Sequence, residues 1–135
     1  MLLNRSMPRS IVIPELAYPN IGEAIDWLSA AFGFTLRIRM GDHRAQMNVG
    51  EGGAVVLIER TRDVSLHTAV MVRVDDVDAH YQRARKMARI LREPADFPYG
   101  ERQYTVEDLA GHHWSFSQSI ADIDPRDWGG TPAEL

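Results

Sequence analysis

The hydrophobic positions along the chain change their spacing in a way that predicts alternating strands and helices. Residues 11–18 begin with a β-branched apolar run, which is typical of a strand, and Pro14 within it favours a place at a sheet edge. Apolar residues then recur at helical spacing over residues 21–32. Asn20 is the expected N-cap of this helix and Gly33 its glycine C-cap.

The same order of elements repeats in the second half of the chain, which predicts two βαβββ modules. Aligning Asn20 with Asp76 brings the two predicted helices into register. Each module alone would leave an apolar sheet face unburied, and two modules together can bury it. We therefore expect a single domain over 1–135, with modules at 11–59 and 66–118 and a tail at 119–135. The remaining strands are predicted at 34–40, 44–49, 54–59, 67–74, 90–97, 101–107 and 112–118.

Composition narrows the classes of function. The 135 residues include no cysteine, which excludes disulfides, cysteine zinc sites and thiol chemistry. The net charge of −4 argues against nucleic acid as the main partner. No apolar stretch reaches the roughly 20 residues that a membrane span needs, and residues 1–10 lack a signal-peptide core. We expect a cytoplasmic protein that binds neither membrane nor nucleic acid.

Four short motifs in a fixed order carry a resemblance to a known family. They are Gly22–Leu28 followed by Phe32–Phe34, then Val74–Ala79, Pro98–Arg102 and Val106–Phe116. The set resembles the vicinal oxygen chelate superfamily of glyoxalases, bleomycin-resistance proteins and extradiol dioxygenases, and in particular its small bleomycin-resistance-like subgroup. The resemblance implies an α+β fold in which two βαβββ modules form an incomplete mixed β-barrel, with helices outside and a ligand cavity inside. It also implies a homodimer, sometimes with modules exchanged between chains.

Metal-dependent members of that superfamily hold the metal with one residue on the first and one on the last strand of each module. Carried onto this sequence, those positions fall at Ile13, Leu57, Ala69 and Ser115. Three of these side chains have no donor atom and a neutral serine is a poor ligand alone. The resemblance combined with these residues therefore predicts a protein without a metal cofactor.

A shift by two residues along each strand leaves one alternative open. Side chains on one strand face recur every second residue, so Glu15, Glu59, His67 and His113 share faces with the expected positions. Each donor is then displaced by about 7 Å along its strand. The displacements run in opposite directions in the two modules, so we expect these donors to diverge.

Alternation on the predicted strands assigns candidate ligand-binding residues. On the last strand, Trp114 and Phe116 form the apolar face, which leaves His113 and Ser115 toward the cavity. On the fifth strand the same rule places Met71 toward the cavity, as an adaptable wall.

Two further candidates come from the sixth and seventh predicted strands and their turn. Arg102 is placed to meet an anionic ligand or to pair with Glu101 or Glu107. Tyr104 is expected near the cavity mouth, where it could stack on a planar ligand.

Three functions remain open on these grounds. The leading hypothesis is metal-independent binding of a small molecule in the barrel cavity. The first alternative is an enzyme, either a metal-dependent lyase, isomerase or dioxygenase with displaced ligands, or a metal-free one that uses His113 or Glu59 as acid or base. The second alternative is a structural or regulatory dimer with a vestigial cavity.

Overall fold

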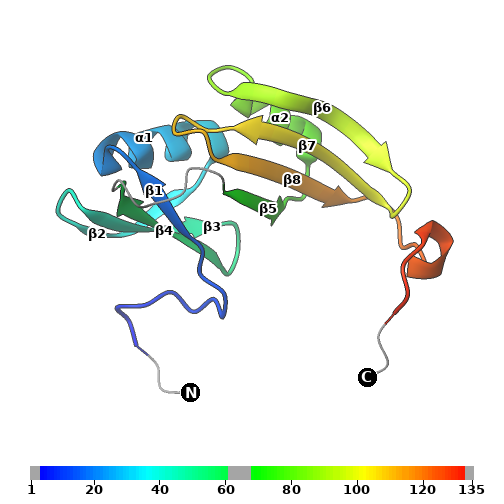
Figure 1. Cartoon of the computed structure of the whole chain (residues 1–135), viewed down its shortest axis with the longest axis horizontal. Helices are drawn as coiled ribbons and strands as arrows, with labels where there is room; N and C mark the ends of the chain where they lie inside the picture. Colours follow the sequence, from blue (N-terminus) through cyan, green and yellow to red (C-terminus); the bar gives the residue numbers. More distant parts are fainter. Residues whose placement is uncertain (1–3, 61–67, 133–135) are drawn as a thin grey trace.

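The computed structural model describes residues 4–60 and 68–132, and the described chain folds as two halves with the same order of elements (Figure 1). The first half contains β1 (Glu15–Tyr18), α1 (Ile21–Phe32), β2 (Thr35–Met40), β3 (Arg44–Val49) and β4 (Gly53–Glu59). The second contains β5 (Ala69–Arg73), α2 (Val77–Ala84), β6 (Arg89–Phe97), β7 (Glu101–Glu107) and β8 (His113–Ser119). A short 3-10 turn, η1 (Pro125–Trp128), follows in the tail.

Each half forms one four-stranded mixed sheet, and the strand order is the same in both. The first sheet has the order β1-β4-β3-β2 and the second β5-β8-β7-β6. The first strand of each half pairs in parallel with the last, and all other pairs are antiparallel. The fold is therefore α+β with two modules, as predicted, and the strands of the described ranges close no barrel.

The helix caps confirm the predicted alignment of the two halves. Asn20 and Asp76 have nearly the same extended conformation, and each side chain accepts a hydrogen bond from the third residue beyond it, Glu23 and Ala79 respectively. Gly33 ends α1 with a φ of 78°, a left-handed conformation that favours glycine.

An arginine on α2 donates hydrogen bonds to the C-terminal end of α1. The Arg83 guanidinium on α2 donates to the carbonyl oxygens of Ala30 and Ser29 in the last turn of α1, at 3.0 and 3.1 Å. A cation there also complements the negative end of the helix dipole. The second half of the chain thereby completes a helix of the first.

Two element boundaries differ from the prediction. The first strand is shorter, because Ile11 and Val12 are 93% and 78% exposed and only residues from Glu15 pair with β4. The helical spacing of Val77, Tyr81, Ala84, Ala88 and Leu91 predicts a longer second helix, but α2 ends at Ala84, and Leu91 lies in β6 and is 37% exposed. Strand β6 tolerates Pro94 because it is an edge strand whose register shifts at this point.

Both helices lie on the same side of the two sheets (Figure 1). The hydrophobic core lies between the helices and the sheets. Phe32 at the end of α1 contacts the rings of Trp114 and Phe116 on β8 at centroid distances of 5.5 and 4.9 Å. This packing confirms that Trp114 and Phe116 form the core-facing side of the last strand. The opposite side of each sheet carries no helix, and we call it the open face.

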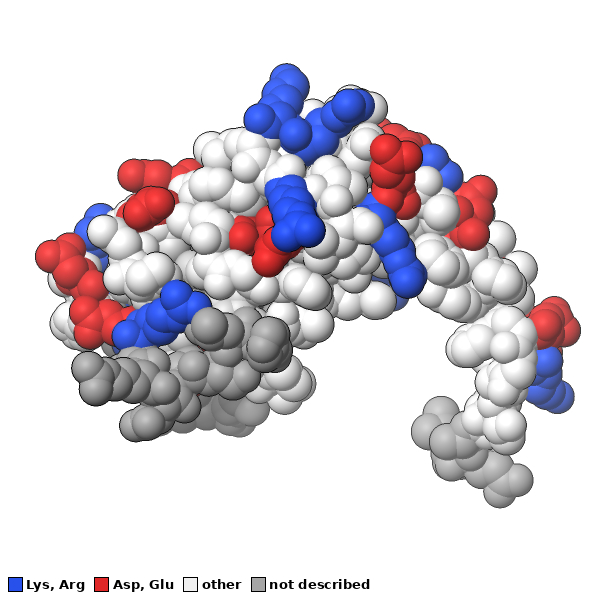
Figure 2. Space-filling model, turned by 45° about the horizontal axis from the view of Figure 1, so that its top comes forward, with Lys and Arg blue, Asp and Glu red and all other residues white. Residues whose placement is uncertain are grey.

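The chain arches over this open side, with the tail projecting at one end (Figure 2). Basic and acidic side chains are interspersed over the face that Figure 2 displays. Within the described ranges, neither helix has the length and apolarity required to cross a membrane.

Candidate functional site

The open face of the second sheet carries a row of hydroxyl and amide side chains. Thr105 and Ser115 lie opposite each other on β7 and β8, and their hydroxyl oxygens are 3.0 Å apart. The Gln103 amide donates to the Ser117 hydroxyl at 3.0 Å. Strand alternation places all four on one face, because their neighbours Tyr104 and Phe116 point into the core. This row presents neutral donors and acceptors to whatever lies against it.

The row ends at a carboxylate. The Ser117 hydroxyl donates to Glu101 at 2.8 Å. Hydrogen bonds from Ser119 and Ser117, together with the positive charge of Arg73, hold the pKa of Glu101 below its usual value. Glu101 is therefore an anion at neutral pH, and the cation that acts on it lies two strands away on β5.

An exposed apolar side chain adjoins the row. Met71 on β5 is 63% exposed and pairs in register with Ser115, while Ala69 pairs with His113. Three residues predicted to face the cavity, Met71, His113 and Ser115, thus lie on the same open face. His113 is exposed at the start of β8, opposite Glu107.

Tyr104 does not face a cavity, and its predicted place was wrong. Its side chain is fully buried, stacked on Phe116, and its hydroxyl is hydrogen-bonded to the imidazole of His80. Burial raises the pKa of this phenol above its usual value. The physical reason is strand alternation, since Tyr104 and Val106 are the apolar side of β7. The same alternation, applied to β7, would have found Gln103 and Thr105.

Arg102 points to the helix side of the sheet, where it forms ion pairs with two acidic side chains. Its guanidinium pairs with Asp78 on α2 and Asp96 on β6, each at 3.0 Å. These partners differ from the expected Glu101 and Glu107, which lie on the open face. The structure therefore separates Arg102 from Met71, His113 and Ser115.

The residues at the family's metal positions do not fit a metal. Leu57 faces the core, so the metal position assigned on β4 was wrong by one residue. The residues of β4 that lie on the open face there are Val56 and Ile58, and their side chains also lack donor atoms. On the second sheet, Ala69 and Ser115 do lie on the open face.

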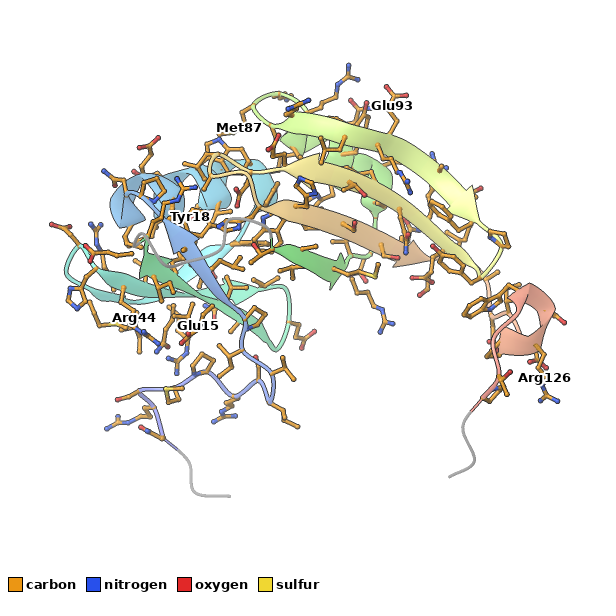
Figure 3. The ribbon with its side chains drawn as sticks, viewed as in Figure 1. Glu15, Tyr18, Arg44, Met87, Glu93 and Arg126 are labelled. Carbon is orange, nitrogen blue, oxygen red and sulfur yellow. The ribbon has the colours of Figure 1, made fainter. Side chains whose placement is uncertain are left out.

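Glu15, Glu59 and His113, the displaced donors that the structure describes, do not come together either. Glu15 lies on the open face, where its carboxylate binds Arg44 at 2.9 Å (Figure 3). Glu59 lies on the opposite face beside Tyr18, so it joins neither Glu15 nor His113. His67 lies outside the described residues. In the described part of the chain, no group of three or more histidine, aspartate or glutamate side chains has a geometry suited to a metal ion.

A buried polar cluster joins the two halves on the helix side. The Asp108 carboxylate accepts hydrogen bonds from the Tyr18 hydroxyl at 2.7 Å and from the Trp114 indole at 3.0 Å. Burial and the Asp108 charge raise the pKa of Tyr18 far above its usual value. The same carboxylate accepts a hydrogen bond from the backbone amide of His112, whose side chain is fully buried. This cluster is structural, because it has no access to solvent.

A pocket of about 290 Å³ lies where the two halves meet. One wall is β5 from Val70 to Arg73, and the other is formed by Val12, Pro14 and the turn between β3 and β4. Because Met71 and Arg73 belong both to this wall and to the open face, the pocket continues the row of polar side chains.

The fold and this face define a class: a two-module α+β protein whose second sheet has a polar open face, with no set of metal donors in its described residues. A family profile described as the Glyoxalase/Bleomycin resistance protein/Dioxygenase superfamily matches residues 10–116, and the chain belongs to this superfamily.

Solved structures of the superfamily share the fold. TioX from Micromonospora sp. ML1 is 36% identical with a TM-score of 0.72, over 82% of this chain and 99% of that one. A glyoxalase/bleomycin resistance protein/dioxygenase from Nocardioides is 20% identical with a TM-score of 0.66, over 93% and 89% of the two chains. Lactoylglutathione lyase from Agrobacterium tumefaciens is 14% identical with a TM-score of 0.68, over 84% and 96%.

Curated relatives include uncharacterised proteins of Mycobacterium bovis and Mycobacterium tuberculosis. Each is 32% identical over 93 residues, which is 68% of this chain. The match covers 57% of the first and 51% of the second, so the chain spans about half the length of these relatives.

Proposed function

We propose that this protein binds a small molecule on the open face of the second sheet without using a metal. The observation that carries the proposal is the pairing of Met71, an exposed apolar side chain, with Ser115 in the row of neutral polar groups. An apolar wall beside a few placed donors and acceptors is the usual make-up of a small-molecule site. The residues at the superfamily's metal positions support the metal-independent form of the proposal.

The site is completed, in this proposal, by a second copy of the chain. The open face of the second sheet has a wall on one side only, whereas ligand sites bury most of their ligand's surface. A homodimer that sets the open face of one protomer against its partner would supply the second wall, and symmetric dimers are the commonest assemblies. Among the described strands, β5 is also an edge strand of its sheet, and edge strands favour pairing with another chain.

A neutral aromatic amide, naphthalene-2-carboxamide, tests the proposal with the full chain. Spectra of protein labelled at its methionine methyl groups should show a shift of the Met71 methyl on titration, in the presence of EDTA as in its absence. Ser115→Leu should weaken binding at least fivefold by filling the row. Arg102→Met is the matched control and should leave the affinity unchanged, because Arg102 points to the other side of the sheet.

Two results would overturn the proposal. One is the absence of any Met71 shift at millimolar amide, and the other is binding that EDTA abolishes and a divalent metal restores. Sedimentation of the same samples should show a dimer. If binding persists in a monomeric sample, the second wall does not come from a partner.

A further inference from the structure

The open face of the first sheet is not bare, because the N-terminal segment crosses it. This segment, Asn4–Pro14, runs along the side of the sheet away from α1 (Figure 1). Pro8 is buried against the sheet, and the Ser10 hydroxyl donates to the Gly52 carbonyl at 2.8 Å. The same segment borders a second pocket of about 220 Å³.

Two side chains of the sheet hold this segment by its backbone. Arg37 donates to the carbonyl oxygens of Arg5 and Met7 at 2.9 and 3.0 Å. The Gln46 amide donates to the carbonyl oxygen between them, that of Ser6, at 2.8 Å. Gln46 in turn accepts a hydrogen bond from Arg37, so the two side chains act as one donor group.

The three carbonyls converge because residues 4–7 form a turn. The Met7 amide donates to the Asn4 carbonyl at 3.2 Å, and the Ser6 amide donates to the Asn4 side chain at 3.0 Å. The three successive carbonyl oxygens of the turn therefore all accept from the same pair of side chains.

The charge of Arg37 is not matched by this neutral occupant. Among the described residues no carboxylate pairs with Arg37, whereas its strand neighbour Arg39 pairs with Asp42 and Arg44 pairs with Glu15. Asparagine, serine, glycine and a second arginine, but no acid, line the pocket beside Arg37. A carboxylate accepts hydrogen bonds from a guanidinium more strongly than neutral carbonyls do, often with two parallel bonds.

Release of the turn would expose little apolar surface. Residues 4–7 are all exposed, including Met7 at 47%. Segments with few buried contacts open locally at low cost. To displace the turn, an anion therefore has to replace the three hydrogen bonds from Arg37 and Gln46, and little apolar contact is lost.

We propose that Arg37 and Gln46 form an anchoring site for a carboxylate of the ligand, and that the turn at residues 4–7 is an internal plug which this carboxylate displaces. The inference rests on the proposed function, because it places the anchor on the open face of the first sheet. In the proposed dimer, this face of one protomer lies against the second sheet of its partner. It adds a ligand class, small organic carboxylates, and a plug that these carboxylates displace.

The test compares naphthalene-2-carboxylate with naphthalene-2-carboxamide, which has the same shape and no charge. The chain lacks cysteine, so Ser6→Cys provides a single site for a trifluoromethyl tag that reports on the plug. The Met71 methyl reports separately on the open face of the second sheet. We expect the carboxylate to move both signals and to bind about tenfold more tightly than the amide, the gain of one charge-assisted contact.

Two variants and one control locate the effect. Arg37→Met should release the plug without ligand and reduce the preference for carboxylate to about one. Gln46→Glu puts a carboxylate inside the site, so it should also release the plug and abolish carboxylate preference while the amide still binds. Arg39→Met, two residues along the same strand, should change neither signal.

The outcomes separate this inference from the proposed function. Movement of Met71 alone, with the tag unmoved by carboxylate, overturns the plug and leaves the proposed function standing. Movement of the tag alone supports the anchor and contradicts binding on the second sheet. Movement of neither signal contradicts both, and an equal response to the amide at the tag contradicts the carboxylate class.

Discussion

The imidazole of His112 donates a hydrogen bond to the main-chain carbonyl oxygen of Ala17 at 2.6 Å, across 95 residues of sequence. Ala17 lies on β1, an edge strand of the first sheet, and His112 lies just before β8 of the second. The other ring nitrogen accepts from the Thr68 hydroxyl. A side chain of the second half thus satisfies a carbonyl oxygen on an edge strand of the first sheet.

His112→Ala should destabilise the protein strongly. The change leaves the Ala17 carbonyl and the Thr68 hydroxyl without their partner and opens a cavity, for which a loss of about 3 kcal/mol in unfolding free energy is expected. Urea denaturation followed by tryptophan fluorescence measures it. The control is His113→Ala, whose exposed side chain should cost less than about 0.5 kcal/mol. Equal effects of the two substitutions would contradict the role given to His112.

Asp108→Asn should also lower stability, by about 2 kcal/mol. The carboxylate accepts from two side-chain donors on one oxygen and two backbone amides on the other, and an amide can present only one of these oxygens. Chemical denaturation again gives the magnitude. Asp42→Asn is the matched control, because its side chain is 95% exposed and pairs only at the surface.

Acid should destabilise the fold through His80. Burial lowers the pKa of His80 to about 4, from 6.5, with its ring between the Phe32 carbonyl and the Tyr104 hydroxyl. The unfolded chain therefore binds more protons between these values, so stability is complete above pH 6.5 and falls as the pH drops toward 4. The loss is at most about 3 kcal/mol.

His80→Gln provides the comparison for that pH dependence. The variant should lose stability at neutral pH, because two hydrogen bonds change, and its stability should fall less steeply between pH 6.5 and 4. Thermal melts at a series of pH values measure both slopes. Parallel curves for the wild type and the variant would show that another group causes the acid sensitivity.

Gly33→Ala should cost about 1–2 kcal/mol, since an alanine is strained at a φ of 78° and its Cβ would lie 2.9 Å from the Arg83 guanidinium. Gly22→Ala in the same helix should be neutral or stabilising. Its backbone is helical, and the nearest atom to the new Cβ is the end of the flexible Arg39 side chain at 3.1 Å. Thermal denaturation of both variants distinguishes backbone strain from the general effect of removing a glycine.

Local chemistry allowed much of this fold to be predicted. The caps at Asn20 and Gly33 act within a few residues, and the alternation of Trp114 and Phe116 with polar neighbours needs only one strand. These signals set the elements and their order. They also placed Met71 and Ser115 correctly on the open face.

Features that depend on distant partners were not accessible from the sequence. Tyr18 meets Asp108 across 90 residues, and nothing near His112 in the sequence marks it as buried. Leu57 was assigned one residue out of register because the length of the β3–β4 turn decides which side each residue faces. The crossing of the N-terminal segment depends on Arg37, whose two partners lie 30 and 32 residues away.

The bonds from Arg83 to the end of α1 bear on how this internally repeated chain can be divided. In a fragment that stops after the first sheet, the Ala30 carbonyl would lose its bond from Arg83 and the Ser29 carbonyl would keep only its bond from Gly33. The second half alone would carry an arginine without these acceptors. The two halves share a plan, yet the end of α1 in the first half depends on a side chain of the second. Mixing separately produced halves should therefore restore structure that neither half attains alone. An exchange of halves between relatives should succeed only where the second half supplies an arginine that fits the end of the first helix.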